Sequence, residues 1–135
     1  MTDADVAALA ARFFDAIEAG DLEAVAACYA PDARIWHNTD GVVQGPDENA
    51  RTLKGMARAF ADRRYQERRL RVFPGGFVQQ HVLRARRLRD GAEVSLAACL
   101  VCETADGRIT RLDEYFDSAA VAAFVGATDT PSTGA

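Results

Sequence analysis

The sequence is poor in the residues that metal sites and disulfide frameworks need. Its 135 residues include two histidines, His37 and His81, and three cysteines. The histidines are far apart in the chain and have no cluster of carboxylates at ligand spacing, so no metal site is expected. An odd number of cysteines argues against a framework of paired disulfides.

Long apolar runs and nucleotide-binding loops are also missing. No stretch approaches the roughly 18 apolar residues of a membrane-spanning helix. The first twenty residues have neither the basic start nor the apolar centre of a secretory signal. We therefore expect no membrane partner and a cytoplasmic location. The sequence lacks the G-x-G-x-x-G pattern and any phosphate-binding loop, so chemistry without a cofactor is expected.

Cys99 and Cys102 form a C-x-x-C pattern, which is typical of redox and zinc sites. They lie in an apolar segment that reads as a strand, and the two-residue period of a strand turns positions 99 and 102 to opposite faces. We expect them to be small apolar residues of the sheet.

Charge is distributed unevenly, although the net charge is only −4. Residues 1–50 carry ten acids and two bases, residues 51–89 two acids and twelve bases, and residues 90–135 eight acids and two bases. A basic middle segment is one signature of nucleic-acid binding. No aromatic RNA-binding motif, zinc finger or helix-turn-helix pattern accompanies it, so we expect a solvated sheet face and no nucleic-acid partner.

Apolar residues at helical spacing predict helices near both ends of the chain and before the strand-rich half. The first runs from Thr2 or Asp3 to Gly20, and a second, short one follows Asp21 and ends before Pro31. A third begins at residues 46–47, with an inward stripe that extends to residues 60 and 61. A last short helix is expected from Ser118 to about residue 125, followed by a disordered tail over residues 126–135.

The intervening segments alternate like strands. Residues 33–38 form one, and residues 65–73, 77–88, 93–104 and 108–117 form four more, with Asp-Gly pairs at two of the joints that are strong hairpin signals. The order α-α-β-α-β-β-β-β predicts one α+β domain over residues 1–125. We expect a cone-shaped α+β barrel, in which helices pack on the concave face of a strongly curved antiparallel sheet and enclose an apolar pocket.

Three segments carry a family resemblance: residues 12–22 (RFFDAIEAGDL), residues 29–33 (YAPDA) and residues 106–117 (DGRITRLDEYFD). On these the chain resembles the nuclear-transport-factor-2-like superfamily, in its SnoaL-like and ketosteroid-isomerase-like branch, over roughly residues 3–125. The resemblance implies the cone fold and a homodimer. It leaves the reaction open, since the superfamily includes isomerases, cyclases, dehydratases, epoxide hydrolases and proteins without catalysis.

Two enzymes of this superfamily provide templates for the site. Ketosteroid isomerase uses a carboxylate base with a tyrosine and a protonated acid as oxyanion donors. A comparison without gaps in the first helix places its tyrosine on Phe13. Its base, at the end of the first strand, falls on or beside His37 and its second acid near Cys99, so both donors are expected to be missing. In enzymes like limonene-epoxide hydrolase, a carboxylate of the last strand matches Glu114. Their Arg-x-Asp pair falls near Gln79 and His81, and neither residue is kept.

Strand alternation favours Glu114 and His81 as inward-facing polar residues. His81 shares its face with Phe77 and Leu83, and Glu114 lies between Leu112 and Phe116 on its own face. A carboxylate between two large apolar side chains is costly to bury unless it is paired or protonated. The catalytic candidates are therefore Glu114, His81 and His37. The side chains expected to bind substrate are Phe13, Trp36, Asn38, Met56, Phe60, Gln79, Cys99, Leu112 and Phe116.

These residues predict cofactor-independent acid–base chemistry on a hydrophobic, cyclic small molecule, by isomerisation or cyclisation through an enolate. Two alternatives remain open: epoxide hydrolysis, and a ligand-binding domain with no chemistry. The loss of both oxyanion donors favours the latter. The arginine-rich strands are expected to form the seam of a homodimer, with acids of the last strands as partners.

Overall fold

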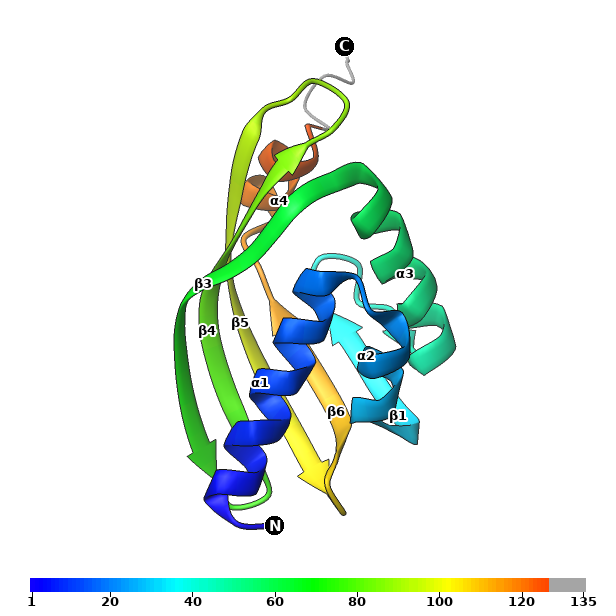
Figure 1. Cartoon of the computed structure of the whole chain (residues 1–135), viewed down its shortest axis with the longest axis vertical. Helices are drawn as coiled ribbons and strands as arrows, with labels where there is room; N and C mark the ends of the chain where they lie inside the picture. The colour runs from blue at the N-terminus through cyan, green and yellow to red at the C-terminus, as the bar shows by residue number, and fades with distance from the viewer. Residues whose placement is uncertain (127–135) are drawn as a thin grey trace.

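The computed structural model describes residues 1–126. Within these residues the chain forms, in order, α1 (Asp3–Ala19), α2 (Leu22–Cys28), β1 (Tyr29–His37), β2 (Val43–Gln44), α3 (Pro46–Ala59), β3 (Phe60–Phe73), β4 (Gly76–Arg87), β5 (Glu93–Ala105), β6 (Arg108–Tyr115) and α4 (Ser118–Val125). The cone-shaped α+β architecture expected from the sequence is confirmed (Figure 1). The expected disordered tail lies, apart from Gly126, outside the described residues.

Short polar side chains cap α1, α2 and α4. The Thr2 hydroxyl accepts a hydrogen bond from the backbone N–H of Asp5 at 3.1 Å, and the Asp5 carboxylate accepts one from the N–H of Thr2 at 2.9 Å. Asp21 caps α2 through the N–H of Ala24. The cap of α4 is Asp117 and not Ser118 as predicted, because the Asp117 carboxylate reaches the N–H of Ala119 at 2.9 Å.

The six strands form one sheet in the order β2-β1-β6-β5-β4-β3. Strands β3 to β6 are antiparallel neighbours joined in sequence, as the Asp-Gly turns predict. The sheet is mixed, however, because β1 runs parallel to β6. The two-residue strand β2 was not predicted, since it is too short to show a period. The β1–β6 pairing brings the N-terminal third of the chain against the last strand.

Strand β3 bends where two residues adopt left-handed backbone conformations. Asp62 has a φ of 55° and Glu67 a φ of 57°, and the register of β3 against β4 shifts at both places. Such bulges increase the local twist of a strand. The chain turns into β3 at Phe60, five residues before the predicted start, so the expectation that residues 60 and 61 extend the third helix is wrong.

Helix α1 lies across the concave face of the sheet (Figure 1). Its inward residues Leu9, Phe13 and Phe14 are at most 1% exposed and join Ile35 and Phe77 of the sheet in the main core. A second, smaller core surrounds Phe60 and Phe124 near α4. The space between these two cores is where the pocket lies. Among residues 1–126, no helix is both long enough and apolar enough to cross a membrane.

Candidate active site

The concave face of the sheet, with α3 and α4, encloses a pocket of about 430 Å³. Most of its wall is apolar, with contributions from Met56, Phe60, Leu83, Phe116 and Phe124. A volume of this size and an apolar wall with a few polar groups are typical of small-molecule sites. The polar groups in the wall are therefore the candidates for chemistry.

His37 and Glu114 form a close pair in this wall, which is an ion pair when the His37 ring is protonated. They are direct register partners at the ends of β1 and β6, and His37 Nε2 lies 3.2 Å from Glu114 Oε1. Their side chains are 19% and 15% exposed. The His37 ring stacks on Phe116, with ring centroids 6.3 Å apart. Both residues line the pocket, so the parallel pairing of distant strands joins two of the predicted catalytic residues.

The charge of Glu114 determines the protonation of His37. Burial alone lowers the pKa of His37, but the hydrogen bond and the negative charge of Glu114, together with the charge of Asp40, outweigh it and raise the pKa above 6.5. When the neutral imidazole donates Nε2–H to Glu114, the lone pair is on Nδ1. No described residue hydrogen-bonds Nδ1, and it is not one of the fully enclosed unpaired atoms. Nδ1 is therefore accessible to a proton donor.

His81 lies in the pocket wall on β4 and is 3% exposed. The amide nitrogen Nε2 of Gln79 lies 2.9 Å from its Nδ1, while its own Nε2 is buried and has no hydrogen-bond partner among residues 1–126. The ring packs against Phe14 and Tyr65, with centroids at 5.1 and 4.4 Å. Burial and then the positive charge of Arg68 lower the pKa of His81 to about 4, so it is neutral at physiological pH.

A chain of polar side chains forms another part of the wall. The Tyr29 hydroxyl donates to Asn49 Oδ1 at 2.9 Å, Asn49 Nδ2 to Gln44 Oε1 at 3.3 Å, and Gln44 Nε2 to Thr52 Oγ1 at 3.0 Å. Asn49 is only 3% exposed. Burial, and then the charge of Glu114, raise the pKa of the nearby Tyr65 phenol far above its usual value. The Tyr65 phenol, like the amides and hydroxyls of the hydrogen-bonded chain, is therefore a neutral hydrogen-bonding group.

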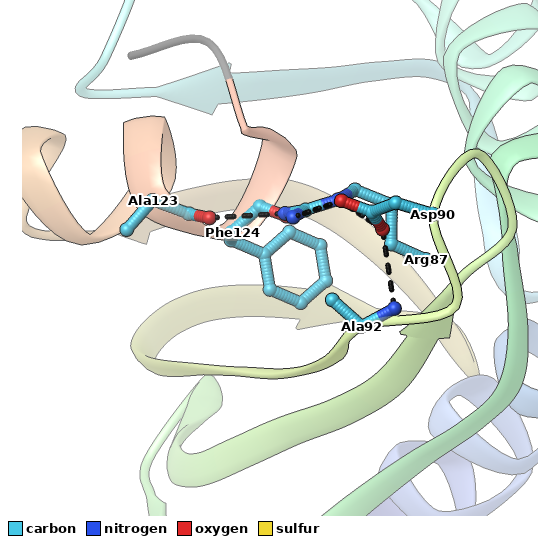
Figure 2. Close-up of polar contacts among 5 residues, drawn as sticks. All are labelled: Arg87, Asp90, Ala92, Ala123 and Phe124. Carbon is cyan, nitrogen blue, oxygen red and sulfur yellow. Dashed lines mark hydrogen bonds and ion pairs between the residues drawn. The ribbon is translucent and has the colours of Figure 1, made fainter. Parts of the chain in front are cut away.

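Helix α4 closes one end of the pocket. Phe124 stacks on Phe60 with ring centroids 4.6 Å apart, and Val121 also lines the cavity. Arg87 Nη1, next to the β4–β5 hairpin, donates to the carbonyls of Ala123 at 3.2 Å and Phe124 at 2.9 Å (Figure 2). Asp90 holds the same guanidinium at 2.8 Å, and this hydrogen bond lowers the pKa of Asp90 to about 2. The hairpin thus fixes α4 over the pocket.

The other predicted binding residues fall into three groups. Met56, Phe60 and Phe116 line the main pocket. Phe13 and Leu112 line a small inner cavity of about 40 Å³ that also touches Glu114. Trp36, Asn38, Gln79 and Cys99 are absent from the lining of both cavities.

Each of these four residues has another role or another position in the structure. The Trp36 indole packs on the Tyr115 ring at 5.3 Å, on the face of the sheet opposite His37. The Asn38 side chain bridges the backbone N–H and carbonyl of Phe116 at 2.9 and 3.0 Å. Gln79 contacts His81, and Cys99 lies in a shallow groove on the outer face. The structure therefore does not place these four side chains in the pocket wall, where direct contact with the substrate was predicted.

Sequence reasoning missed Asn49, Gln44 and Thr52 as part of the wall. Asn49 precedes Leu53 by one helical turn, so helical spacing places it on the inward stripe of α3. A polar residue on this apolar stripe was the signal in the sequence that could have identified it. Gln44 belongs to the short strand that showed no pattern. Among the described residues, no three histidine, cysteine or acidic side chains gather in an arrangement that could hold a metal ion.

A family model for the SnoaL-like domain matches residues 10–112. The chain belongs to the SnoaL-like family. It therefore falls within the nuclear-transport-factor-2-like superfamily, with a fold like that of ketosteroid isomerase. No curated protein matches the chain.

Solved structures with the same fold have different described activities. A proposed polyketide cyclase from Xanthomonas campestris pv. campestris is 19% identical, with a TM-score of 0.82 over 92% of this chain and 99% of that one. AclR of Streptomyces galilaeus, described as a proposed hydroxylase, is 14% identical, with a TM-score of 0.82 over 93% and 98%. A protein of unknown function from Burkholderia pseudomallei is 20% identical, with a TM-score of 0.79 over 93% and 98%. These TM-scores establish the fold, and a small-molecule domain of the isomerase or cyclase type is the function that the family supports.

Proposed function

We propose that this SnoaL-like domain catalyses acid–base chemistry without a cofactor, by isomerising or cyclising a hydrophobic cyclic carbonyl compound through an enolate. The observation that carries the proposal is the His37–Glu114 pair at 3.2 Å in the wall of an apolar pocket. A base held by a carboxylate in such a site is suited to removing a proton from carbon next to a carbonyl.

In this proposal His37 is the base and Glu114 orients it. His37 Nδ1 takes the proton from the carbon next to the substrate carbonyl, and the electron pair of the C–H bond moves into the enolate. The imidazolium that forms is stabilised by the Glu114 carboxylate on Nε2, since an adjacent negative charge favours the protonated ring. For isomerisation, Nδ1 returns the proton to another carbon. For cyclisation, the enolate carbon attacks a second carbonyl of the same molecule and the new alkoxide takes the proton.

The pocket supports a substrate of this class. Its volume of about 430 Å³ and the aromatic rings of Phe60, Phe116 and Phe124 suit a compact ring system. The polyketide cyclases among the solved structures of the same fold are consistent with cyclisation.

The test is turnover of a panel by wild type, H37Q and E114Q, with E23Q, which removes an exposed carboxylate on α2 away from the pocket, as the control. The panel holds a β,γ-unsaturated ketosteroid, an aromatic polyketide ester and a terpene epoxide. We expect turnover of a carbonyl substrate that H37Q abolishes, E114Q reduces by about a hundredfold or more, and E23Q retains. Turnover that H37Q retains in full contradicts the assignment of His37.

Ligand binding without catalysis is the second candidate. It is favoured by Phe13, a buried apolar residue where ketosteroid isomerase has a donor, and by Cys99, which lies on the outer face. Tight binding of the panel compounds with no turnover supports this role. Turnover of the epoxide alone supports the third alternative, hydrolysis assisted by Glu114.

We also propose that the domain acts as a homodimer through the outer face of the sheet. A groove of about 800 Å³ is lined by Arg69, Cys99 and Tyr115 of this face and also by His81 and Phe116, and Tyr115 is 46% exposed. Exposed arginines on β3 and β4 and acids on β5 and β6 give this face charges of both signs, although each exposed pair contributes little. Sedimentation at micromolar concentration tests the proposal, and a monomer contradicts it.

A further inference from the structure

Asn38 extends the pairing of β1 with β6 beyond the last register partners. Those partners are His37 and Glu114, and the next backbone hydrogen bond runs from the N–H of Asn38 to the carbonyl of Glu114 at 3.0 Å. The side chain continues the pairing, because Asn38 Oδ1 accepts from the backbone N–H of Phe116 at 2.9 Å and Nδ2 donates to the Phe116 carbonyl at 3.0 Å. A carboxylate can only accept, so a side-chain amide is suited to both contacts.

The residue that Asn38 holds carries the ring that covers His37. Phe116 follows the last residue of β6 and is separated from α4 by Asp117 alone. Its ring stacks on the His37 imidazole, with an angle of 10° between the planes and centroids 6.3 Å apart, and it also packs against both cores. Because the two Asn38 contacts fix the backbone of Phe116, they also fix the point from which its ring reaches the imidazole.

The stacked ring restricts how the imidazole of His37 can turn. The torsion of a histidine ring about its Cβ–Cγ bond has a broad, roughly two-fold preference, so the rotamer alone does not select the edge that faces Glu114. A half-turn would exchange Nε2 with Cε1 and would leave a carbon beside the carboxylate. A parallel aromatic ring hinders this turn, because the two rings would collide on the way. Phe116 therefore helps to keep His37 Nε2 at 3.2 Å from Glu114 Oε1.

We infer that Asn38 is a positioning residue of the His37–Glu114 pair: its side-chain amide fixes Phe116, and the Phe116 ring holds the imidazole with Nε2 on the carboxylate. The inference rests on the proposed function and deepens it. Asn38 is exposed and is absent from the lining of both cavities, so it acts through Phe116 and not by contact with a ligand. This role replaces the expectation that Asn38 binds the substrate.

The first test is an NMR titration of His37 in the free protein, for wild type, N38A, F116L and the double variant. The charges that raise the pKa of His37 are those of Glu114 and Asp40, and every variant keeps both. A ring that leaves the carboxylate and becomes more exposed to water has a pKa closer to the ordinary 6.5. We therefore expect a lower pKa of His37 in N38A and in F116L than in wild type. In the F116L background, N38A is expected to add no further shift.

The matched control is Q66A, which removes another exposed side-chain amide, one that accepts from Arg84 Nε at 2.6 Å and is absent from the pocket lining. It is expected to leave the pKa of His37 unchanged. An unchanged pKa of His37 in N38A overturns the inference, and so does an N38A shift that is equal with and without the Phe116 ring. Should F116L fail to fold, the nuclear Overhauser contacts between the His37 and Phe116 rings decide, since N38A is expected to weaken them and unchanged contacts overturn the inference.

The second test separates positioning from contact with the substrate. On a panel compound that wild type turns over, N38A is expected to lower kcat by about tenfold to a hundredfold, the effect of a misplaced reacting group, and to leave KM nearly unchanged. A raised KM with an unchanged kcat indicates direct contact with the substrate and overturns the inference.

The two tests also separate the inference from the proposed function. If no panel compound is turned over, the proposed function fails, while the titration of His37 still decides whether Asn38 positions the pair. Turnover that H37Q abolishes, with the same pKa of His37 in N38A and wild type, keeps the proposed function and removes the role of Asn38.

Discussion

Replacing Glu114 by glutamine keeps the shape of the side chain and removes the negative charge 3.2 Å from His37 Nε2. At this distance two unit charges attract by about 1.3 kcal/mol at the dielectric constant of water and by about 5 kcal/mol at an effective value of about 20. The two side chains are 19% and 15% exposed, so the pair lies between these limits. We expect a coupling free energy of about 2 kcal/mol when His37 is protonated, in the range of hydrogen bonds to charged groups.

The coupling free energy between His37 and Glu114 is expected to decrease as the pH rises. The folded state raises the pKa of His37 above 6.5, the value of an unstructured histidine, so the folded protein holds this proton more tightly. The stabilisation is therefore fully present below pH 6.5 and is lost as the pH rises through the pKa of the folded state. Urea unfolding of wild type, H37Q, E114Q and the double variant gives the coupling, measured at about pH 6 and about pH 9.

The control variant is E23Q, which removes an exposed carboxylate from α2 and leaves the pair intact. It is expected to change stability by less than about 0.5 kcal/mol at either pH. A coupling between His37 and Glu114 that is equal at the two pH values, or one near zero at the lower pH, refutes the assignment of a charged pair.

Three further predictions follow from contacts of the described residues. R87A removes the donor to two carbonyls of α4, so amide hydrogen exchange is expected to accelerate in α4 before other helices, and unchanged protection of α4 contradicts this role. N49A leaves the buried Tyr29 hydroxyl without its acceptor and is expected to lower the unfolding free energy by about 1 to 3 kcal/mol, measured in urea. A thiol reagent is expected to label Cys99 first when the protein is dilute enough to be monomeric, because the other two thiols are buried within the chain, and mass spectrometry identifies the site.

The sequence predicts most of the fold because its signals are local. Helix starts at Thr2 and Asp21 and the Asp-Gly turns follow from short-range hydrogen bonding and backbone preference. The parallel pairing of β1 with β6 depends on residues far apart in the chain, and no local pattern reports it. The start of β3 was misplaced because Phe60 fits a helical stripe as well as a strand, and the packing against Phe124 decides between them.

Parts of the site were predictable for the same reason. Alternation along a strand placed His81 and Glu114 on the concave face, where the structure has them. Cys99 was placed near the pocket by comparison with another enzyme, and an offset of one residue moves a strand side chain to the opposite face. The ion pair itself could not be predicted, since the chain alone does not indicate that His37 and Glu114 are register partners.

The parallel pairing also determines when the site can exist during synthesis. Strands β3 to β6 follow one another as hairpins and can pair as they emerge, whereas His37 must wait for Glu114, which is made 77 residues later. Contacts between such distant segments form slowly, because closing a long loop costs chain entropy before the contact is gained. A nascent or truncated chain that ends within β5 can therefore pair β3 with β4 and yet have no base–carboxylate pair. The NMR signal of His37 distinguishes a domain in which β1 has paired with β6 from one that is merely collapsed.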